Sequence, residues 1–155
     1  MPLSGDLTDI TIRPVVSGDL AQLAALIRDL AAYHGEEAAT TVDSLKRDLF
    51  GWSRCLDGFV ATKERELVGY ALFYPIYNVQ RAERGLDLTH LFVSGNERGQ
   101  GIGSRLIKAV EAEAKSRACA FVAIGTASEN FAAQHFYARR FGKGRQSGPR
   151  YRLAV

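Results

Sequence analysis

The stretch Arg98-Gly99-Gln100-Gly101-Ile102-Gly103-Ser104 places three glycines between an apolar run that ends at Val93 and a helical pattern that follows. The first turn of a helix has unpaired backbone N–H groups and the positive end of the helix dipole. Glycines there lack Cβ atoms, so an anion can approach the backbone, and Gly99 and Gly101 also allow positive φ angles that turn N–H groups toward one point. With the charge of Arg98 at its rim, this loop is predicted to bind a pyrophosphate.

Other glycine-rich phosphate loops fit this stretch less well. A P-loop needs Gly-Lys before Ser or Thr, and the Lys is missing before Ser104. The dinucleotide fingerprint needs a third glycine where this chain has Ser104, counted from Gly99, or Leu106, counted from Gly101. The glycines could also serve only a tight turn between strand and helix. Counting Gly95, however, four glycines fall within nine residues, which is more than a turn requires.

Helical and strand-like spacings of apolar residues alternate on both sides of this loop. Strands are expected at 10–13, 59–62, 67–77, 86–93, 120–124 (a buried strand) and 151–155, and helices at 17–35, 41–51, 104–117 (after the glycine loop) and 130–140. Thr41 and Gly51 are expected to begin and end the second helix, and Pro75 to mark a bulge or an edge. The order β-α-α-β-β-β-α-β-α-β predicts an α/β fold. We expect a mixed central sheet of about six to seven strands flanked by about four helices.

The composition is that of an ordinary globular protein. The chain has 155 residues, of which 46% are hydrophobic and 24% charged, so a single domain over residues 1–155 is expected. No apolar run reaches the roughly 18 residues that cross a bilayer, and the amino terminus lacks a secretory pattern. Cys55 and Cys119 show no metal-ligand spacing. These features predict a cytoplasmic protein with free thiols and no membrane contact.

The basic residues gather at the carboxyl end. Residues 130–155 contain six Lys and Arg and no Asp or Glu, against a net charge of +3 for the whole chain, which leaves −3 for the first 129 residues. Such a region could meet a phosphorylated ligand or nucleic acid, or it could simply be a solvated face. Because interleaved surface aromatics and a helix-turn-helix pattern are missing, nucleic acid is not an expected partner.

Two motifs carry a resemblance to a known family. The loop from Arg98 to Gly103 resembles the Arg/Gln-x-x-Gly-x-Gly/Ala signature of the GNAT superfamily of acetyl-CoA-dependent N-acetyltransferases. Asn130, Phe136-Tyr137 and Gly142 resemble the Asn…Phe-Tyr…Gly helix of the same family. The resemblance covers nearly the whole chain and implies a GNAT-like sheet. Further segments look most like the diamine (spermidine/spermine, thialysine) acetyltransferase branch, namely Ile12-Arg13-Pro14, 27–33, Asp48-Leu49-Phe50-Gly51 and Leu91-Phe92-Val93.

The resemblance implies acetyl-CoA as co-substrate and assigns residues to it. The backbone of Leu91, Phe92 and Val93 would pair with the pantetheine arm as an added strand. Asn130 would hydrogen-bond the arm, and the same side chain could serve as an N-cap of the last helix. The pyrophosphate would bind the segment that comprises Arg98, Gly99, Gln100, Gly101, Ile102, Gly103 and Ser104.

Tyr137 is the candidate general acid. A phenol pKa near 10 is close enough to the thiol value of about 8.5 for proton transfer to a leaving thiolate, although an aromatic packed on the core with a satisfied hydroxyl is the alternative. The attacking amine must lose a proton, and Asp87 and His90 are candidate bases, with Asp87 ahead. Unless a bulge intervenes, one face of that strand is shared by Asp87, Thr89, Leu91 and Val93.

The acceptor side departs from the branch it resembles. Diamine acetyltransferases carry acidic residues at the positions of Thr89 and His34, and these acids attract a polycation. Tyr33 and His34 end the first helix, where this fold usually meets the acceptor, so Tyr33, His34, Thr89 and His90 are the expected substrate-binding residues. An uncharged, zwitterionic or amino-acid-like amine is therefore at least as plausible as a polyamine.

The sequence thus predicts an enzyme that acetylates a primary amine of a small molecule by direct attack in a ternary complex. Acetylation of a protein amine and binding of acetyl-CoA without chemistry are the alternatives. The resemblance implies a homodimer. No metal is expected, because His34, His90 and His135 lack an i, i+4 pairing.

Overall fold

The computed structural model describes residues 9–126, 130–141 and 152–154. The chain divides into two compact units, Met1–Ile124 and Gly125–Val155. Within the described ranges, no helix combines the length and the apolar character that crossing a bilayer requires.

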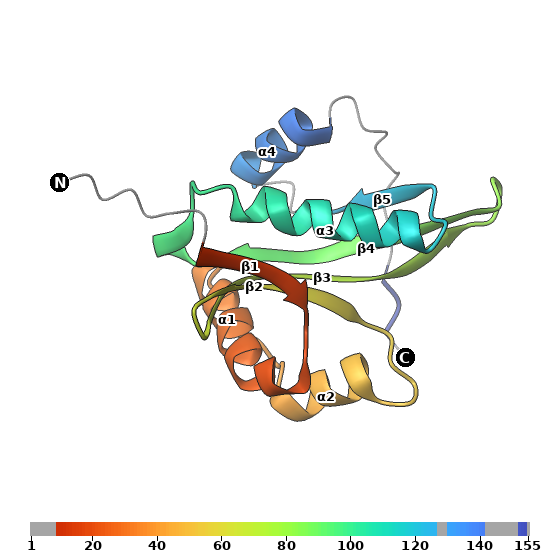
Figure 1. Ribbon diagram of the computed structural model, residues 1–155. Coiled ribbons are helices and arrows are strands. Elements are labelled where there is room, and N and C mark those ends of the chain that lie inside the picture. Colours follow the sequence, from red (N-terminus) through yellow and green to blue (C-terminus); the bar gives the residue numbers. More distant parts are fainter. Residues whose placement is uncertain (1–8, 127–129, 142–151, 155) are drawn as a thin grey trace. The chain divides into compact units, whose positions relative to one another are not determined.

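The first unit is built on a five-stranded sheet in the order β1-β2-β3-β4-β5 (Figure 1). The strands are β1 Ile10–Pro14, β2 Asp57–Lys63, β3 Glu66–Asn78, β4 Glu83–Val93 and β5 Phe121–Ile124. The first four strands pair antiparallel with their neighbours, and β5 runs parallel to β4, so the predicted mixed sheet is confirmed.

In the described part of the chain the sheet has five strands, against the six to seven that the sequence predicted. Of the expected closing strand, Tyr151 and Val155 lie outside the described residues, and residues 152–154 carry no strand. Strand β5 is confirmed at 121–124, but its residues are half-buried rather than buried. In the described part of the chain β4 is its only strand neighbour, so β5 lies at an edge of the sheet.

Helices cover both faces of this sheet, as the sequence predicted. Helices α1 (Leu20–Tyr33) and α2 (Val42–Phe50) lie on one face and α3 (Ile102–Ser116) on the other (Figure 1). The apolar side of α1, with Leu23 fully buried, packs in one core cluster with Val60, Tyr70 and Leu72 of the sheet. Burial of each such side chain stabilises the fold by about 1.5–3 kcal/mol. The helical spacing of the leucines places them on the one face of α1 that is buried. The opposite core is formed by α3 through Ile102, Leu106, Ile107, Val110 and Ala114.

The expected caps of α2 are present. The Thr41 hydroxyl accepts a hydrogen bond from the Ser44 N–H at 3.1 Å, and Gly51 ends the helix. Pro75 lies in β3 beyond Phe73, the last residue that pairs with β2, so no strand of the described ranges lies beside the proline on that edge. This confirms the expected edge, because proline has no N–H to donate to a neighbouring strand.

Strand β4 contains a bulge at Thr89. Leu72 of β3 pairs with His90, but the next residue, Phe73, pairs with Leu88, which leaves Thr89 unmatched. The period-two expectation for this strand is therefore wrong, because an extra residue reverses the alternation of the side chains that precede it. Asp87 shares its face with His90 and Phe92, on the side of α1, while Leu91 and Val93 lie on the side of α3.

Beyond the bulge, β4 has an open edge. Strand β5 pairs only with Gly85–Leu88 of β4, so the described chain supplies no strand beside 89–93 on that side. The Ser94 N–H bonds the Val68 carbonyl of β3 at 2.8 Å. Since backbone groups of successive residues in a strand turn to opposite edges, those of Phe92 face β3 and those of Leu91 and Val93 face the open edge.

The second unit contains one described helix, α4 (Phe131–Phe141), close to the predicted 130–140. The Asn130 Oδ1 atom accepts a hydrogen bond from the Ala133 N–H at 3.1 Å. Asn130 is therefore the N-cap of α4, which is one of the two roles that the sequence suggested for it. Gly142 lies outside the described residues.

Candidate active site

The glycine loop joins the end of β4 to the start of α3. After a short 3-10 turn at Gly95–Glu97, Gly99 adopts φ +80° and Gly101 φ +76°. Both angles lie in the left-handed region that favours glycine, as the sequence predicted. Gly101 is the N-cap of α3 and supplies no side-chain cap, so the N–H groups of the first turn remain available to a ligand.

Space lies over this loop. A Cβ atom added to Gly99 or Gly101 would meet no atom within 4 Å, and one added to Gly103 would meet only Val93 Cγ2 at 3.9 Å. Unpaired N–H groups, the positive end of a 15-residue helix and an unobstructed backbone are what a pyrophosphate needs. The residues present therefore fit the phosphate groups of acetyl-CoA.

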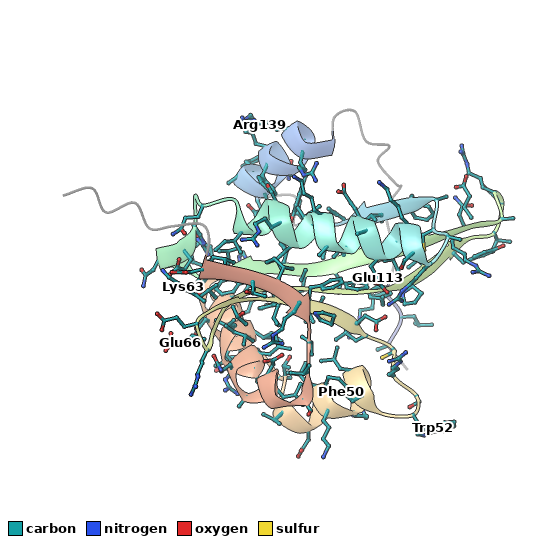
Figure 2. All side chains as sticks on the ribbon, viewed as in Figure 1. Phe50, Trp52, Lys63, Glu66, Glu113 and Arg139 are labelled. Carbon is teal, nitrogen blue, oxygen red and sulfur yellow. The ribbon has the colours of Figure 1, made fainter. Side chains whose placement is uncertain are left out.

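An ion pair fastens the loop to the sheet, and a hydrogen bond inside the loop shares the same carboxylate. Lys63, at the end of β2, lies 3.1 Å from Glu97 through its Nζ atom (Figure 2). The Gln100 Nε2 atom donates to the same carboxylate at 3.1 Å. The side chain of Gln100 is thus used inside the loop, which leaves its backbone N–H as the group it can offer to a phosphate.

The Arg98 side chain turns toward the aromatic residues near α1. Its Nε atom donates to the Val93 carbonyl at 2.9 Å. Its guanidinium carbon lies 5.3 Å from the Tyr33 ring centre and 5.8 Å from that of Phe92. The charge of Arg98 was expected at the rim of the phosphate loop, and the structure places it between the loop and the expected acceptor side.

The expected acceptor residues gather at the end of α1 and on β4. The rings of Tyr33 and His34 meet edge to face with centres 5.4 Å apart, and Tyr33 is 71% exposed. His90 lies on the α1 side of β4, where burial and the nearby His34 both lower its pKa. Thr89 is exposed at the bulge. The structure therefore brings Tyr33, His34 and His90 together around one helix end.

His90 has a buried partner that was not predicted from the sequence. The Tyr70 hydroxyl lies 2.8 Å from the Nδ1 atom of His90, and the two rings stack with centres 5.8 Å apart. Tyr70 is fully buried, and burial raises the pKa of its phenol. In sequence, Tyr70 alternates with Leu72 and is indistinguishable from an ordinary core residue of β3.

The candidate catalytic residues belong to different units. Asp87 is buried on β4, between Tyr74 of β3 and Ala123 of β5, and the bulge puts it on the same face as His90. Tyr137 lies on α4, with its ring centre 5.6 Å from that of Phe136, and burial raises the pKa of its phenol. Of the predicted site residues, only Asn130 and Tyr137 fall in the second unit.

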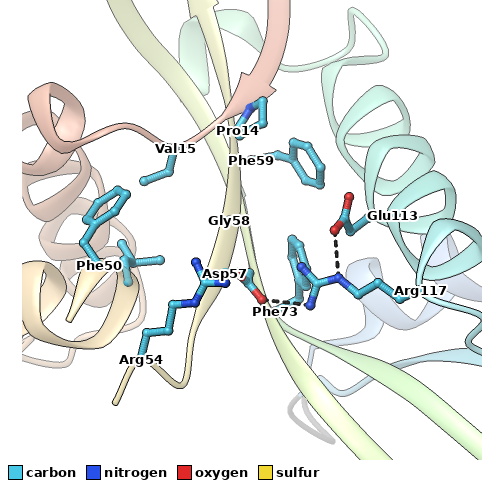
Figure 3. Close-up of a pocket in the computed structure, with 11 residues that line it drawn as sticks. Pro14, Val15, Phe50, Arg54, Asp57, Gly58, Phe59, Phe73, Glu113 and Arg117 are labelled. Atoms are coloured by element: carbon cyan, nitrogen blue, oxygen red, sulfur yellow. Dashed lines mark hydrogen bonds and ion pairs between the residues drawn. The ribbon is translucent and has the colours of Figure 1, made fainter. Parts of the chain in front are cut away.

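A cavity elsewhere in the first unit contains none of the predicted site residues. It measures about 180 Å³ and lies at the ends of β1 and β2 (Figure 3). Arg117 crosses it, bonded to Glu113 at 2.7 Å and to Asp57 at 3.0 Å. Arg117 also lies 5.7 Å from the Phe73 ring centre. These contacts tie α3 to the sheet, which gives the cavity a structural explanation.

Comparisons with known proteins agree with this geometry. The family described as "Acetyltransferase (GNAT) family" matches residues 23–142. Thialysine N-epsilon-acetyltransferase from Bos taurus is 30% identical over 138 residues, which cover 83% of this chain and 81% of the relative. The protein of the same name from Sus scrofa is 31% identical over 123 residues, or 73% of this chain and 72% of the relative.

A solved structure shows the same fold. An aminoglycoside acetyltransferase from an uncultured soil metagenomic sample, in complex with sisomicin, superposes with a TM-score of 0.79 at 19% identity. The match covers 96% of this chain and 97% of that one. By sequence and by fold, the chain is an acyltransferase that belongs to the acetyltransferase (GNAT) family, whose members use acetyl-CoA as co-substrate.

Proposed function

We propose that this enzyme transfers the acetyl group of acetyl-CoA to a primary amine of a small molecule, by direct attack in a ternary complex. The observation that carries the proposal is the edge of β4 at 89–93, beside which the described residues supply no strand, followed by the uncapped, glycine-rich start of α3. One ligand with an extended amide arm and a pyrophosphate matches both features.

The chain offers groups for each part of acetyl-CoA. The backbone groups of Leu91 and the N–H of Val93 lie on the open edge and would pair with the pantetheine amides, with Phe92 between them bonded to β3. The first-turn N–H groups from Ile102 to Ser104 would hold the pyrophosphate. Asn130 uses Oδ1 to cap α4, and its Nδ2 group would donate to the arm.

The proposed chemistry needs one acid and one base. As the amine nitrogen bonds to the thioester carbon, the carbon–sulfur bond breaks and the sulfur leaves with the electron pair. Tyr137 would give its phenolic proton to that sulfur. Burial raises the pKa of Tyr137, so the phenol carries its proton at neutral pH but is a weaker acid than a free phenol. Asp87 would take the proton that the amine loses, directly or through a water molecule.

The acceptor is proposed to be amino-acid-like rather than a polyamine. The two relatives are named for acetylating thialysine, and the compared structure is named for aminoglycosides. All three names refer to small molecules that carry amines. His34 and Thr89 stand where the diamine branch carries acids, which weakens attraction for a polycation. The same resemblance implies a homodimer.

The test is an amine panel with detection of the released thiol of coenzyme A. The expected result is turnover with at least one small primary amine, and a fall in kcat of about 10²-fold or more in Tyr137→Phe with the acetyl-CoA Kd unchanged. Tyr77→Phe is the matched control, because Tyr77 is exposed at the far end of β3. Binding of acetyl-CoA without turnover of any amine would instead favour a non-catalytic module, and an unchanged rate in Tyr137→Phe would remove the acid.

A further inference from the structure

We propose that His90 contacts the acceptor as a hydrogen-bond donor, held in that form by the buried hydroxyl of Tyr70, and that it thereby selects an amine that also carries a carboxylate. This inference rests on the proposed function, since it concerns the acceptor of the same reaction. It assigns a positioning role to Tyr70 and removes His90 from the candidate bases.

The first step is the direction of the hydrogen bond between the two side chains. The Tyr70 hydroxyl is 2.8 Å from Nδ1 of His90, and in the described part of the chain this is its only hydrogen bond. Tyr70 is 0% exposed, so water cannot accept its proton. A buried hydroxyl that has an acceptor within reach donates to it, because leaving a buried donor without a partner is energetically unfavourable. The hydroxyl of Tyr70 therefore donates, and Nδ1 accepts.

The second step follows from the chemistry of imidazole. A neutral ring carries one proton, so a ring that accepts at Nδ1 carries that proton on Nε2. Protonation of Nδ1 would leave the Tyr70 hydroxyl without an acceptor inside the core. Burial and the neighbouring His34 oppose the cation as well, and both lower the pKa of His90. At neutral pH the ring is a neutral donor at Nε2, and it has no lone pair there for the proton of an amine.

The third step is the charge around the ring. His34 approaches from the end of α1, and the Arg98 guanidinium lies over Phe92, the next residue on the same face of β4. Among the described residues, His90 bonds the Tyr70 hydroxyl and Arg98 bonds the Val93 carbonyl, and neither partner is a carboxylate. A donor, a second imidazole and a guanidinium complement a carboxylate and repel a second ammonium group.

Asp87 completes the pattern on the same face of β4. The bulge at Thr89 puts Asp87 on the same face of β4 as His90 and Phe92. On this face the carboxylate of Asp87 lies on one side of His90, and the Arg98 guanidinium lies over Phe92 on the other side. A zwitterionic amine would find its ammonium group next to Asp87 and its carboxylate next to His90 and Arg98. A diamine without a carboxylate would satisfy only the first contact.

The test compares amines that differ only by a carboxylate. The pairs are lysine with cadaverine, ornithine with putrescine, and thialysine with its decarboxylated form, each assayed for kcat/KM. The wild type is expected to prefer the carboxylate member by about tenfold or more, which corresponds to one or two good hydrogen bonds. Turnover of amines without such a preference would overturn the inference and leave the proposed function standing. Failure of every amine would refute the function instead.

Two His90 variants separate a donor from a base. His90→Gln keeps an N–H donor near the position of Nε2, and His90→Leu removes it. If His90 is a donor, Gln retains most of the preference and Leu loses it, about tenfold, chiefly through KM. If both variants instead lose kcat alike and keep the preference, His90 acts as the base and the inference is wrong.

Nuclear magnetic resonance of the imidazole nitrogens tests Tyr70 without any turnover. The Nε2–H form is expected for His90 in the wild type. In Tyr70→Phe the ring is expected to lose this preference and its pKa to rise, whereas Tyr77→Phe should change neither. An Nδ1–H ring in the wild type, or identical His90 signals in Tyr70→Phe, would overturn the positioning role.

Discussion

Arg98 donates through Nε to the carbonyl of Val93 at 2.9 Å, so the first residue of the glycine-loop motif is fastened to the last residue of β4. The contact occupies an acceptor on the edge where pantetheine is proposed to pair. It also holds the guanidinium against Tyr33 and Phe92. One side chain therefore joins the proposed phosphate loop, the proposed cofactor edge and the acceptor side.

Arg98→Ala is expected to weaken acetyl-CoA binding about tenfold, because it removes a charge-assisted hydrogen bond that sets the path of the loop. Arg98→Lys keeps the charge but not the planar Nε donor, so it should recover only part of the loss. Titration calorimetry with coenzyme A measures both. Full recovery by Lys would mean that charge alone matters and that the bond to Val93 does not.

Gly103→Ala separates ligand binding from stability. Gly103 is in the first turn of α3 and has no positive φ, and a Cβ there makes only an ordinary contact of 3.9 Å with Val93. Alanine should therefore stabilise the helix, by about 0.5–1 kcal/mol. If a pyrophosphate lies over this turn, the added methyl group lowers the affinity for coenzyme A by about tenfold or more. Unchanged affinity in the more stable variant would place the phosphates elsewhere.

Gly101→Ala and Gly95→Ala form a matched pair. Gly101 has φ +76° and Gly95 has no such angle, and a Cβ meets no atom within 4 Å at either position. Alanine at 101 is therefore expected to cost about 1–2 kcal/mol of backbone strain, and alanine at 95 to stay within about 0.5 kcal/mol. Urea denaturation measures the difference. Equal stabilities would show that the loop relaxes without the left-handed residue.

The helices, their caps and the glycine loop could be predicted because their signals are local. Thr41 and Gly51 bracket α2 as expected, and the positive φ angles of Gly99 and Gly101 follow from the glycines themselves. The GNAT family could be named for the same reason, since both of its motifs are short and keep their order in the chain. The roles proposed for Asn130 and Tyr137 remain predictions.

The bulge and the Tyr70–His90 contact could not be predicted, because both depend on how distant strands pair. No glycine or proline interrupts the alternation from Asp87 to Val93, and only the register with β3 shows that Thr89 is the extra residue. Tyr70 and His90 are 20 residues apart and meet only across two paired strands. The residues proposed for the acceptor side therefore remain predictions. The faces of β4 on which they lie, and the tautomer of His90, could not be derived from the sequence.

Asp19 connects the end of β1 to the start of α1. It accepts two hydrogen bonds from Arg13, at 2.7 and 2.8 Å, and one from the Val16 N–H at 2.9 Å, while being 5% exposed. The bond from Arg13 is the main reason that the pKa of Asp19 lies below its usual 3.8. Asp19→Asn should cost about 1–2 kcal/mol at pH 7, reduced from a fully buried pair because Arg13 is 35% exposed.

The pH dependence of that cost has a definite sign. A lowered carboxyl pKa stabilises the fold above pH 3.8, where the unfolded chain is also ionised, and the contribution is lost as the pH falls through the lower folded value. The wild type and Asp19→Asn should therefore converge in acid. Asp48→Asn is the control, since Asp48 accepts two hydrogen bonds from Arg47 on the surface. No measurable change in the free energy of unfolding is expected for this variant. An equal loss in both variants would show that burial of Asp19 is irrelevant.

The lowered pKa of His90 leads us to expect a second pH dependence of the free energy of unfolding, at a less acidic pH. Its folded pKa lies below the ordinary histidine value of 6.5, so between those two values the unfolded chain binds a proton that the folded chain excludes. The free energy of unfolding should accordingly fall as the pH drops below about 6.5, with a slope of at most about 1.4 kcal/mol per pH unit from this group. His90→Gln removes the titrating ring, so its free energy of unfolding should change less with pH in this range. Urea denaturation at pH values from about 7.5 to about 5, on both sides of the ordinary histidine pKa, measures the difference. Parallel curves for the two proteins would mean that His90 accepts a proton in the core without penalty, which the buried hydroxyl of Tyr70 should forbid.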